Sequence, residues 1–295
     1  MNLDFFIMGT EKGGSTYLLD CLREHPGIFM PRREVSFFEN YLYDPDDLTA
    51  FTSQFEEAQA GQKLGVKRPT MLGHPQFGER LNRHFPEAKL IAILRHPIDR
   101  ALSAYTQHKT IRTIPNRPAE WFFDRILQGP IDGYPRASLV LEHGLYERNL
   151  RRVERFFPAD RIFLLTLDEV REDNLGALRR AYRFLGVDED YQPTGAKRQP
   201  MRAPYSPILA GYRRLQSRVL HEMTDDGFLV RRNLPLVKTA DLASVAGYRV
   251  LEAILPRGEK PRLSPELRGR LLAYYDEDIT GLERRLNRDL SAWRR

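Results

Sequence analysis

The sequence is poor in cysteine, with Cys21 as the single example in 295 residues. One thiol cannot form an intrachain disulfide, and it cannot build a zinc site from clustered cysteines. The chain also has no apolar run near the ~20 residues that a membrane-spanning helix requires. These absences exclude a disulfide-stapled scaffold and a cysteine-based zinc fold, and we expect no integral membrane segment.

The first residues lack the pattern of a targeting sequence. The start MNLDFFIMG carries the acidic Asp4 and a short apolar run, whereas a signal peptide needs a basic start and a longer apolar stretch. Charged residues make up 29% of the chain, and the mean hydropathy is −0.51. We therefore expect a soluble cytoplasmic protein, and the sequence leaves open whether it forms a homo-oligomer.

Positive charge is concentrated in one stretch. Residues 195–238 hold nine Lys/Arg and three Asp/Glu, a local excess of 9 − 3 = +6, which equals the net charge of the whole chain. The stretch is either a solvated basic surface or a rim that gathers a polyanionic cofactor or acceptor. The chain shows no recognisable nucleic-acid reading motif and no recognisable pattern of interleaved aromatic and basic residues, so we expect no nucleic-acid partner.

Short apolar runs alternate with helical patterns in the first half of the chain, as in βαβ units. The runs predict strands at Leu3–Met8, Ile28–Met30, Leu64–Lys67, Lys89–Leu94 and Arg161–Leu167. We predict an α/β fold: one domain over residues 1–295, a central parallel sheet of four or five strands with helices on both faces, and a helical C-terminal part that forms a lid.

Helices are predicted from apolar spacing and from their end signals. The expected helices cover Ser15–Glu24, Glu142–Phe157, Leu175–Leu185 and a segment that starts at Ser264. The last of these carries one apolar stripe, which we interpret as core. Residues 204–253 read as irregular helix.

The stretch GTEKGGST, residues 9–16, lies between an expected strand and an expected helix. Glycines allow a tight turn and close approach to a ligand, and the first amides of the following helix point at whatever anion binds there. Lys12 adds a mobile charge, and Ser15 and Thr16 add hydroxyl donors. The pattern indicates a phosphate-binding loop; an ordinary glycine-rich turn is the alternative.

The loop differs from the nucleotide-triphosphatase pattern G-x-x-x-x-G-K-[ST]. Gly9 and Gly14 have the required spacing, but residue 15 is serine and the lysine lies at position 12. No strand ends in an obvious magnesium-binding aspartate. An ATP-dependent small-molecule kinase is therefore the weaker alternative.

A second stretch, LRHPIDRALSAY over residues 94–105, follows the Lys89–Leu94 strand. Arg95 lies at the carboxyl end of that strand, the edge where open α/β sheets bind ligands. Ser103 lies about two turns into the next helix. An arginine and a hydroxyl in this arrangement can hold a second phosphate.

Together the two stretches resemble the sulfotransferases that use 3'-phosphoadenosine 5'-phosphosulfate (PAPS), particularly the carbohydrate and heparan-sulfate branch and its bacterial relatives. The segments FFPADRIFLLTLDEV, FLGV and DLSAW resemble the later parts of that family. In the family the loop holds the 5'-phosphosulfate, while the strand-end arginine and helical serine hold the 3'-phosphate. The resemblance implies a donor site formed by Lys12, Gly13, Gly14, Ser15, Thr16, Tyr17, Arg95 and Ser103. Arg198 and Arg202, in the basic stretch, are further candidate contacts to the 3'-phosphate or the acceptor.

The segment PRREVSFFE, residues 31–39, resembles the part of the family in which a glutamate followed by two aromatics is the catalytic base. The resemblance gives this role to Glu34; the alternative is a surface ion pair with Arg32 or Arg33. Ser36 stands where heparan enzymes often carry histidine, which leaves the acceptor geometry open.

Lys67 resembles an active-site lysine of the carbohydrate branch, where it contacts the transferred sulfonate; a structural surface lysine is the alternative. The cytosolic branch has a histidine base two residues after a lysine here, and Pro69 excludes one. His74 and His108 are rival bases that we interpret as ordinary loop or surface histidines.

The resemblance implies in-line transfer of a sulfonate group to a hydroxyl of a small-molecule or glycan acceptor. Lys12 and the loop amides would stabilise charge on the leaving phosphate. Fixed cations would do the work of magnesium in phosphoryl transfer, so we expect PAPS as donor and no metal. The sequence does not identify the acceptor.

Overall fold

The structure is a computed structural model, and it describes residues 1–39, 42–194, 206–224, 227, 229–231 and 261–295. The chain divides into two units, each assembled from separate stretches of sequence. The first comprises Met1–His96, Leu145–Met201 and Glu277–Arg295, and the second comprises Pro97–Gly144 and Arg202–Asp276. The prediction of one domain over residues 1–295 stays a prediction.

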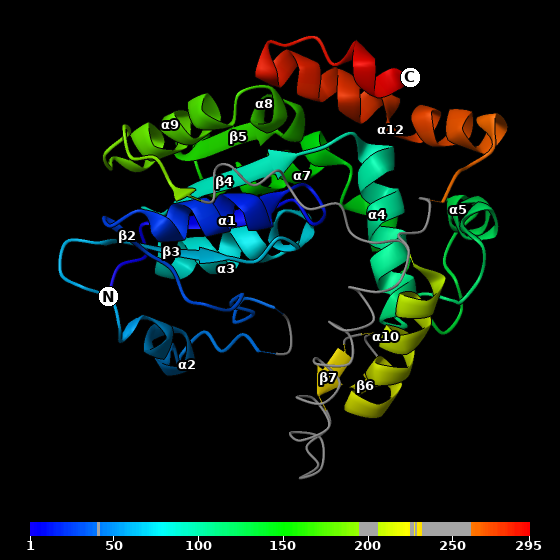
Figure 1. Ribbon diagram of the computed structural model, residues 1–295, viewed down its shortest axis with the longest axis horizontal. Coiled ribbons are helices and arrows are strands. Elements are labelled where there is room, and N and C mark those ends of the chain that lie inside the picture. The colour runs from blue at the N-terminus through cyan, green and yellow to red at the C-terminus, as the bar shows by residue number, and fades with distance from the viewer. Residues whose placement is uncertain (40–41, 195–205, 225–226, 228, 232–260) are drawn as a thin grey trace. The chain divides into compact units, whose positions relative to one another are not determined.

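The first unit contains a five-stranded parallel sheet with strand order β2-β3-β1-β4-β5 (Figure 1). The strands are β1 (Phe5–Gly9), β2 (Ile28–Phe29), β3 (Lys63–Lys67), β4 (Lys89–Leu94) and β5 (Ile162–Thr166). The sheet confirms the predicted α/β class and all five strands. Because the strands are parallel, the loops that follow β1, β3 and β4 lie at one edge.

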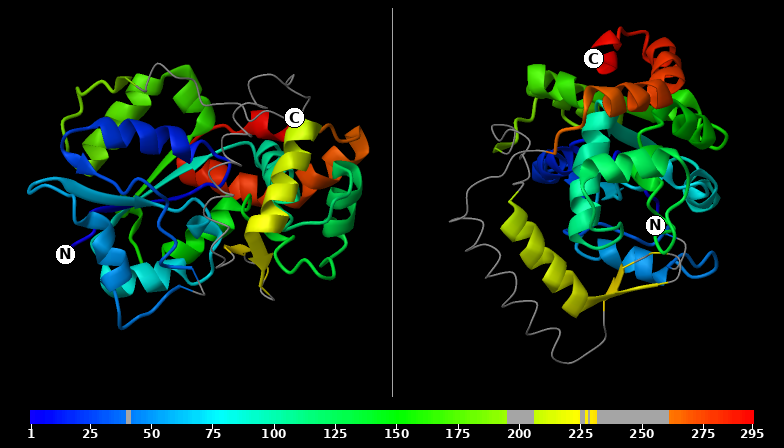
Figure 2. Two further views of the ribbon diagram at one scale, coloured as in Figure 1. Left: turned by 60° about the horizontal axis from the view of Figure 1, so that its bottom comes forward. Right: turned by 90° about the vertical axis from the view of Figure 1, so that its right-hand side faces the viewer.

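Helices cover both faces of the sheet (Figures 1 and 2). One face is covered by α1 (Ser15–Glu24) and α9 (Asn174–Leu185), and the other by α3 (Phe77–His84) and α7 (Tyr146–Val153). On the second face, the rings of Phe6 and Phe77 lie 4.8 Å apart between centroids. This confirms the predicted layering.

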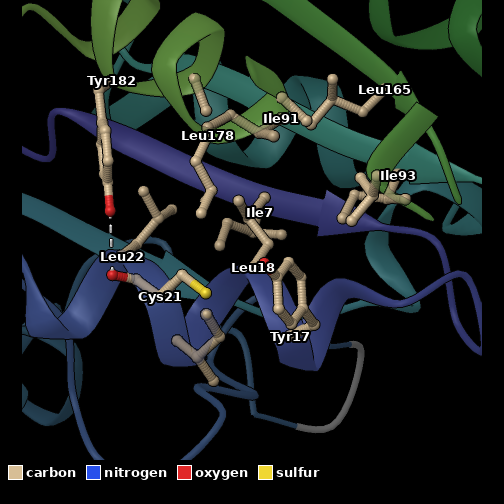
Figure 3. Packing of buried hydrophobic residues seen from close by; sticks show 14 of the residues in the cluster. Ile7, Tyr17, Leu18, Cys21, Leu22, Ile91, Ile93, Leu165, Leu178 and Tyr182 are labelled. Atoms are coloured by element: carbon tan, nitrogen blue, oxygen red, sulfur yellow. Dashed lines mark hydrogen bonds between the residues drawn. The ribbon is translucent and has the colours of Figure 1, made fainter. Parts of the chain in front are cut away.

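The core between the sheet and α1 and α9 is apolar, as Figure 3 shows. Ile7, Ile91 and Ile93 are fully buried, and each such side chain contributes ~1.5–3 kcal/mol relative to exposure. The Tyr182 hydroxyl donates to the carbonyl oxygen of Cys21 at 3.2 Å, which joins α9 to α1. This packing holds α1 against the sheet.

The predicted helix Glu142–Phe157 is wrong in its boundaries. The chain instead forms α6 (Leu139–Glu142) and α7, with a turn between them. Gly144 lies in this turn, where an added Cβ would be 3.0 Å from the Tyr275 hydroxyl. The amides of Glu147 and Arg148 donate to the Asp278 carboxylate at 3.0 and 2.9 Å, so a tertiary contact sets the start of α7.

In its described residues the second unit is mainly helical. Its elements include α4 (Pro97–Thr110), α5 (Ala119–Leu127), α6 and α10 (Pro207–Leu220), with the antiparallel pair β6 (His221–Met223) and β7 (Leu229–Arg231). Within this unit, Ser217 of α10 donates to the carbonyl of Ile111 at 3.0 Å. The β6–β7 pair corrects the prediction of irregular helix through 204–253, of which residues 204–205, 225–226, 228 and 232–253 lie outside the described residues.

The predicted C-terminal helix is confirmed as α12 (Pro265–Leu286). Its apolar stripe is core: Leu271, Tyr275, Ile279 and Leu282 are at most 2% exposed. That this part forms a lid stays a prediction. The remaining short elements are α2 (Thr49–Thr52), η1 (Ser53–Phe55), η2 (Met71–Gly73), η3 (Ala159–Arg161), α8 (Leu167–Glu172) and η5 (Ser291–Arg294). Among the described helices, none has the length and apolarity to cross a bilayer.

Candidate active site

The β1–α1 loop is held tightly against β4. The Thr10 amide donates to the carbonyl oxygen of Ile93 at 3.0 Å. A Cβ added to Gly13 would lie 2.4 Å from that same oxygen, so only glycine fits there. Gly14 precedes α1 with φ at 105°, a conformation that glycine adopts without strain.

The start of α1 is suited to an anion. Its first N–H groups have no acceptor within the helix, and Gly14 supplies no side-chain cap. Lys12 is half-buried in the same loop, with φ at 63°. Ser15 is 4% exposed, and Thr16 is exposed. Unpaired helix amides, a lysine and two hydroxyl-bearing residues thus lie in one loop and helix N-terminus, a combination that favours phosphate or sulfate.

Arg95 directly follows β4 and lies against this loop. Its Nη1 donates to the carbonyl oxygen of Lys12 at 3.2 Å. The Tyr146 hydroxyl donates to the carbonyl oxygen of Arg95 at 2.7 Å, and the Tyr146 ring contacts that of Trp293, with centroids 6.0 Å apart. The loop lysine and the strand-end arginine therefore lie at the same edge of the sheet.

Of the other predicted donor contacts, Ser103 and Tyr17 are both buried. Ser103 is buried in α4, in the second unit, so its pairing with Arg95 stays a prediction. The Tyr17 ring lies in the apolar core (Figure 3), and burial raises the pKa of its hydroxyl. Arg198 and Arg202 lie outside the described residues.

The segment that carries Glu34 is fastened to the sheet by its neighbours. The Val35 amide donates to the carbonyl oxygen of Lys67 at 3.3 Å. Phe37 and Phe38 are buried, and the ring of Phe38 lies 5.9 Å from that of Phe6 on β1, centroid to centroid. The backbone bond from Val35 to Lys67 and the buried aromatic rings together place Glu34 beside the end of β3.

Lys67, the last residue of β3, joins this segment to the β1–α1 loop. Its Nζ donates to Glu34 Oε1 at 2.8 Å and to Thr16 Oγ1 at 2.9 Å. The Lys67 side chain is 2% exposed, while that of Glu34 is 35% exposed. Glu34 therefore pairs with Lys67 and not with Arg32 or Arg33, and one buried ammonium connects the candidate base to the anion loop.

Sequence reasoning missed Arg68 and Glu39. Arg68 Nη1 donates to Glu34 Oε2 at 3.1 Å, while its Nε and Nη2 donate to Glu39 Oε1 at 2.9 and 2.6 Å. Glu39 is 2% exposed. The one available signal was an acidic residue directly after the two buried aromatics, because a buried carboxylate needs a cationic partner.

The rival histidines make local contacts. His108 is on α4, where its Nδ1 lies 2.7 Å from the Thr113 hydroxyl, and His74 follows η2, with its amide bonded to the carbonyl of Met71 at 2.9 Å. Within the described ranges, no group of three or more His, Cys, Asp or Glu side chains could hold a metal ion. That the reaction needs no metal stays a prediction.

The first unit has a parallel sheet whose β1–α1 loop carries amides and a lysine beside a strand-end arginine. This arrangement, at the carboxyl ends of the strands, is of the kind that favours a phosphate- or sulfate-bearing ligand. A carboxylate held by two cations beside that loop adds a candidate acid–base group. Residues 2–198 match the family profile described as "Sulfotransferase domain". The chain therefore belongs to the sulfotransferase family.

Curated relatives agree with the family. The chain is 30% identical over 182 residues to heparan sulfate glucosamine 3-O-sulfotransferase 6 of mouse and of human, a match that covers 61% of this chain and 51% of theirs. Mouse heparan sulfate glucosamine 3-O-sulfotransferase 3B1 is also 30% identical, over 61% of this chain and 45% of its own length. The match thus spans about half the length of these relatives.

A solved structure shows the same fold. The sulfotransferase from Alicyclobacillus acidocaldarius superposes with a TM-score of 0.67 at 22% identity, and the alignment covers 100% of both chains. This likeness concerns the fold, and it agrees with the parallel sheet and helical layers described above.

Proposed function

We propose that the protein transfers a sulfonate group from PAPS to a hydroxyl of an acceptor. The observation that carries the proposal is the position of Lys67, whose Nζ bonds both to Thr16 of the anion loop and to Glu34. A sulfuryl donor in the loop would thereby lie beside a carboxylate able to accept a proton. Membership of the sulfotransferase family supports this reaction class.

The donor carries two anionic groups, and the first unit offers cations for both. Lys12, Gly13, Gly14, Ser15 and Thr16 would hold the 5'-phosphosulfate through the loop amides, the ammonium and the hydroxyls. Arg95, bonded to the carbonyl of Lys12 at 3.2 Å, would hold the 3'-phosphate together with Ser103. Tyr17 is a further proposed donor contact, and Arg198 and Arg202 are proposed to contact the 3'-phosphate or the acceptor.

In the proposed reaction Glu34 takes the proton of the acceptor hydroxyl as its oxygen attacks sulfur. The new S–O bond forms in line with the bond to the 5'-phosphate, which breaks, so that the products are a sulfate ester and adenosine 3',5'-bisphosphate. Negative charge grows on the departing phosphate oxygen. Lys12 and the loop amides would stabilise that charge, and Lys67 would contact the transferred sulfonate.

The proposed acceptor is a glycan or a natural-product alcohol. The curated relatives are named for transfer to a heparan sulfate glucosamine, and Glu34 is 35% exposed, which allows a hydroxyl to reach it. Ser36 replaces the histidine expected in heparan enzymes, so the acceptor contacts are proposed to differ from theirs. The cytoplasmic location remains a prediction.

The test of the base uses radiolabelled PAPS and a panel of glycan and small alcohol acceptors, with release of labelled sulfate to water as the acceptor-independent reaction. Glu34→Gln is expected to lower turnover by ~10²–10⁴-fold while donor binding persists. The matched control is Glu24→Gln, on α1 away from the loop. Near-normal turnover by Glu34→Gln would reject Glu34 as the base.

A further inference from the structure

Two cationic side chains, those of Lys67 and Arg68, hold the Glu34 carboxylate, and they differ in how firmly each is itself fixed. Lys67 contacts Oε1 with a single ammonium, whereas Arg68 contacts Oε2 at 3.1 Å through one arm of its planar guanidinium. The opposite side of the same guanidinium is fixed, because Nε and Nη2 both donate to Glu39 Oε1. Arg68 therefore bridges an exposed carboxylate and a buried one.

Glu39 is a rigid anchor for this bridge. It is 2% exposed, and its amide donates to the carbonyl oxygen of Ser36 at 2.9 Å, which closes the turn around the two buried aromatics. A carboxylate so buried requires a paired charge. A guanidinium pre-organised on a rigid partner gives up little further side-chain freedom when it binds a second carboxylate.

We propose that Arg68, anchored on Glu39, is a positioning residue that holds Glu34 in the orientation needed for proton transfer. This inference rests on the proposed function, because it assigns a role relative to Glu34 as base. Arg68 itself needs no contact with the donor in this account. Fixing both carboxylate oxygens, one by Lys67 and one by Arg68, leaves the Glu34 side chain little rotation about its last bond.

Removal of the Arg68 guanidinium should lower kcat and leave donor binding nearly unchanged. Displacing a reacting group by about 1 Å costs ~10²-fold in rate, so Arg68→Met should lower kcat for sulfate release from labelled PAPS by about 10–100-fold. The dissociation constant for adenosine 3',5'-bisphosphate should change less than about threefold, because the donor loop is untouched. Arg68→Lys retains the charge but not the planar fork, and we expect it to recover only part of the lost kcat.

The control is Arg80→Met. Arg80 Nη1 donates to the carbonyl oxygen of Phe38 at 2.9 Å, so it supports the same turn without bonding to Glu34. We expect its kcat to stay within about threefold of wild type. If Arg68→Met fails to fold because Glu39 is left buried and unpaired, Arg68→Met with Glu39→Met removes both charges and is expected to show the same loss of kcat.

The outcomes separate the two proposals. A folded Arg68→Met or double variant with wild-type kcat, or a loss in kcat that Arg80→Met reproduces, overturns the positioning role while leaving PAPS-dependent transfer intact. A wild-type protein that neither binds the bisphosphate nor releases sulfate from PAPS overturns the proposed function itself. A loss confined to kcat in the Arg68 variants supports the inference.

Discussion

Replacing Gly13 by alanine tests whether the anion loop is as tightly held as its contacts indicate. The added Cβ would lie 2.4 Å from the carbonyl oxygen of Ile93, against a practical minimum of 3.0 Å. The loop must therefore move by at least 3.0 − 2.4 = 0.6 Å relative to β4. The added Cβ would also lie 3.1 Å from the carbonyl oxygen of Thr10 and 3.2 Å from its Cβ. The two nearest obstacles are backbone oxygens, which cannot rotate away as a side chain could.

The expected cost has two parts. Overpacking of this kind costs ~1–3 kcal/mol, and the shift weakens the hydrogen bond from the Thr10 amide to Ile93, which is worth ~1 kcal/mol. A loss of ~2–4 kcal/mol corresponds to a fall in Tm of ~5–15 °C. Because the loop amides would move with the backbone, affinity for adenosine 3',5'-bisphosphate should also fall.

The assay is thermal unfolding with and without the bisphosphate, with Gly269→Ala as matched control. Gly269 lies in α12 with nothing within 4 Å of an added Cβ, so alanine there should raise stability by up to ~1 kcal/mol. A Gly13→Ala protein with the Tm and bisphosphate affinity of wild type would refute the close fit of the loop.

Two further predictions follow from titratable groups in the first unit. Burial raises the pKa of Cys21 to about 11. At pH 8, iodoacetamide should therefore leave the thiol of the native protein unmodified but label the thiol of the protein unfolded in urea. Rapid labelling of the native protein would contradict the burial of Cys21. Burial alone would raise the pKa of Glu147, but hydrogen bonds from Arg285 and Arg151 outweigh it and the pKa is lowered. The pKa of Glu147 is lower in the folded protein than in the unfolded protein. The contribution of Glu147 to the stability of the fold is therefore complete above the ordinary carboxyl pKa range, and it is lost as pH falls through the folded pKa. The free energy of unfolding of Glu147→Gln should then decline less than that of wild type between about pH 5 and pH 3, and parallel declines would exclude this contribution.

The sheet and its first helix could be predicted from the sequence because their signals are local. The apolar run Lys89–Leu94 is β4 to the residue, and Ser15–Glu24 is α1 to the residue. The loop between β1 and α1 was predicted for the same reason: glycine spacing after a buried strand reports backbone geometry directly. Arg95 was predicted at the strand end, where the structure places it beside Lys12.

Other features depend on contacts between distant segments. The start of α7 is set by Asp278, more than 100 residues away, and the apolar pattern of residues 142–157 carries no trace of it. The bridge from Glu39 through Arg68 to Glu34 likewise requires the turn after β2 to meet the end of β3. The register of that meeting is a property of the fold, so sequence spacing could not reveal it.

The most direct measurement is calorimetric titration of the full chain with adenosine 3',5'-bisphosphate and, separately, with ATP. We expect the bisphosphate to bind at least ~10-fold more tightly than ATP, and Lys12→Ala to weaken it by a similar factor. Equal or tighter binding of ATP, or bisphosphate affinity unaffected by Lys12→Ala, would contradict a donor site built on this loop.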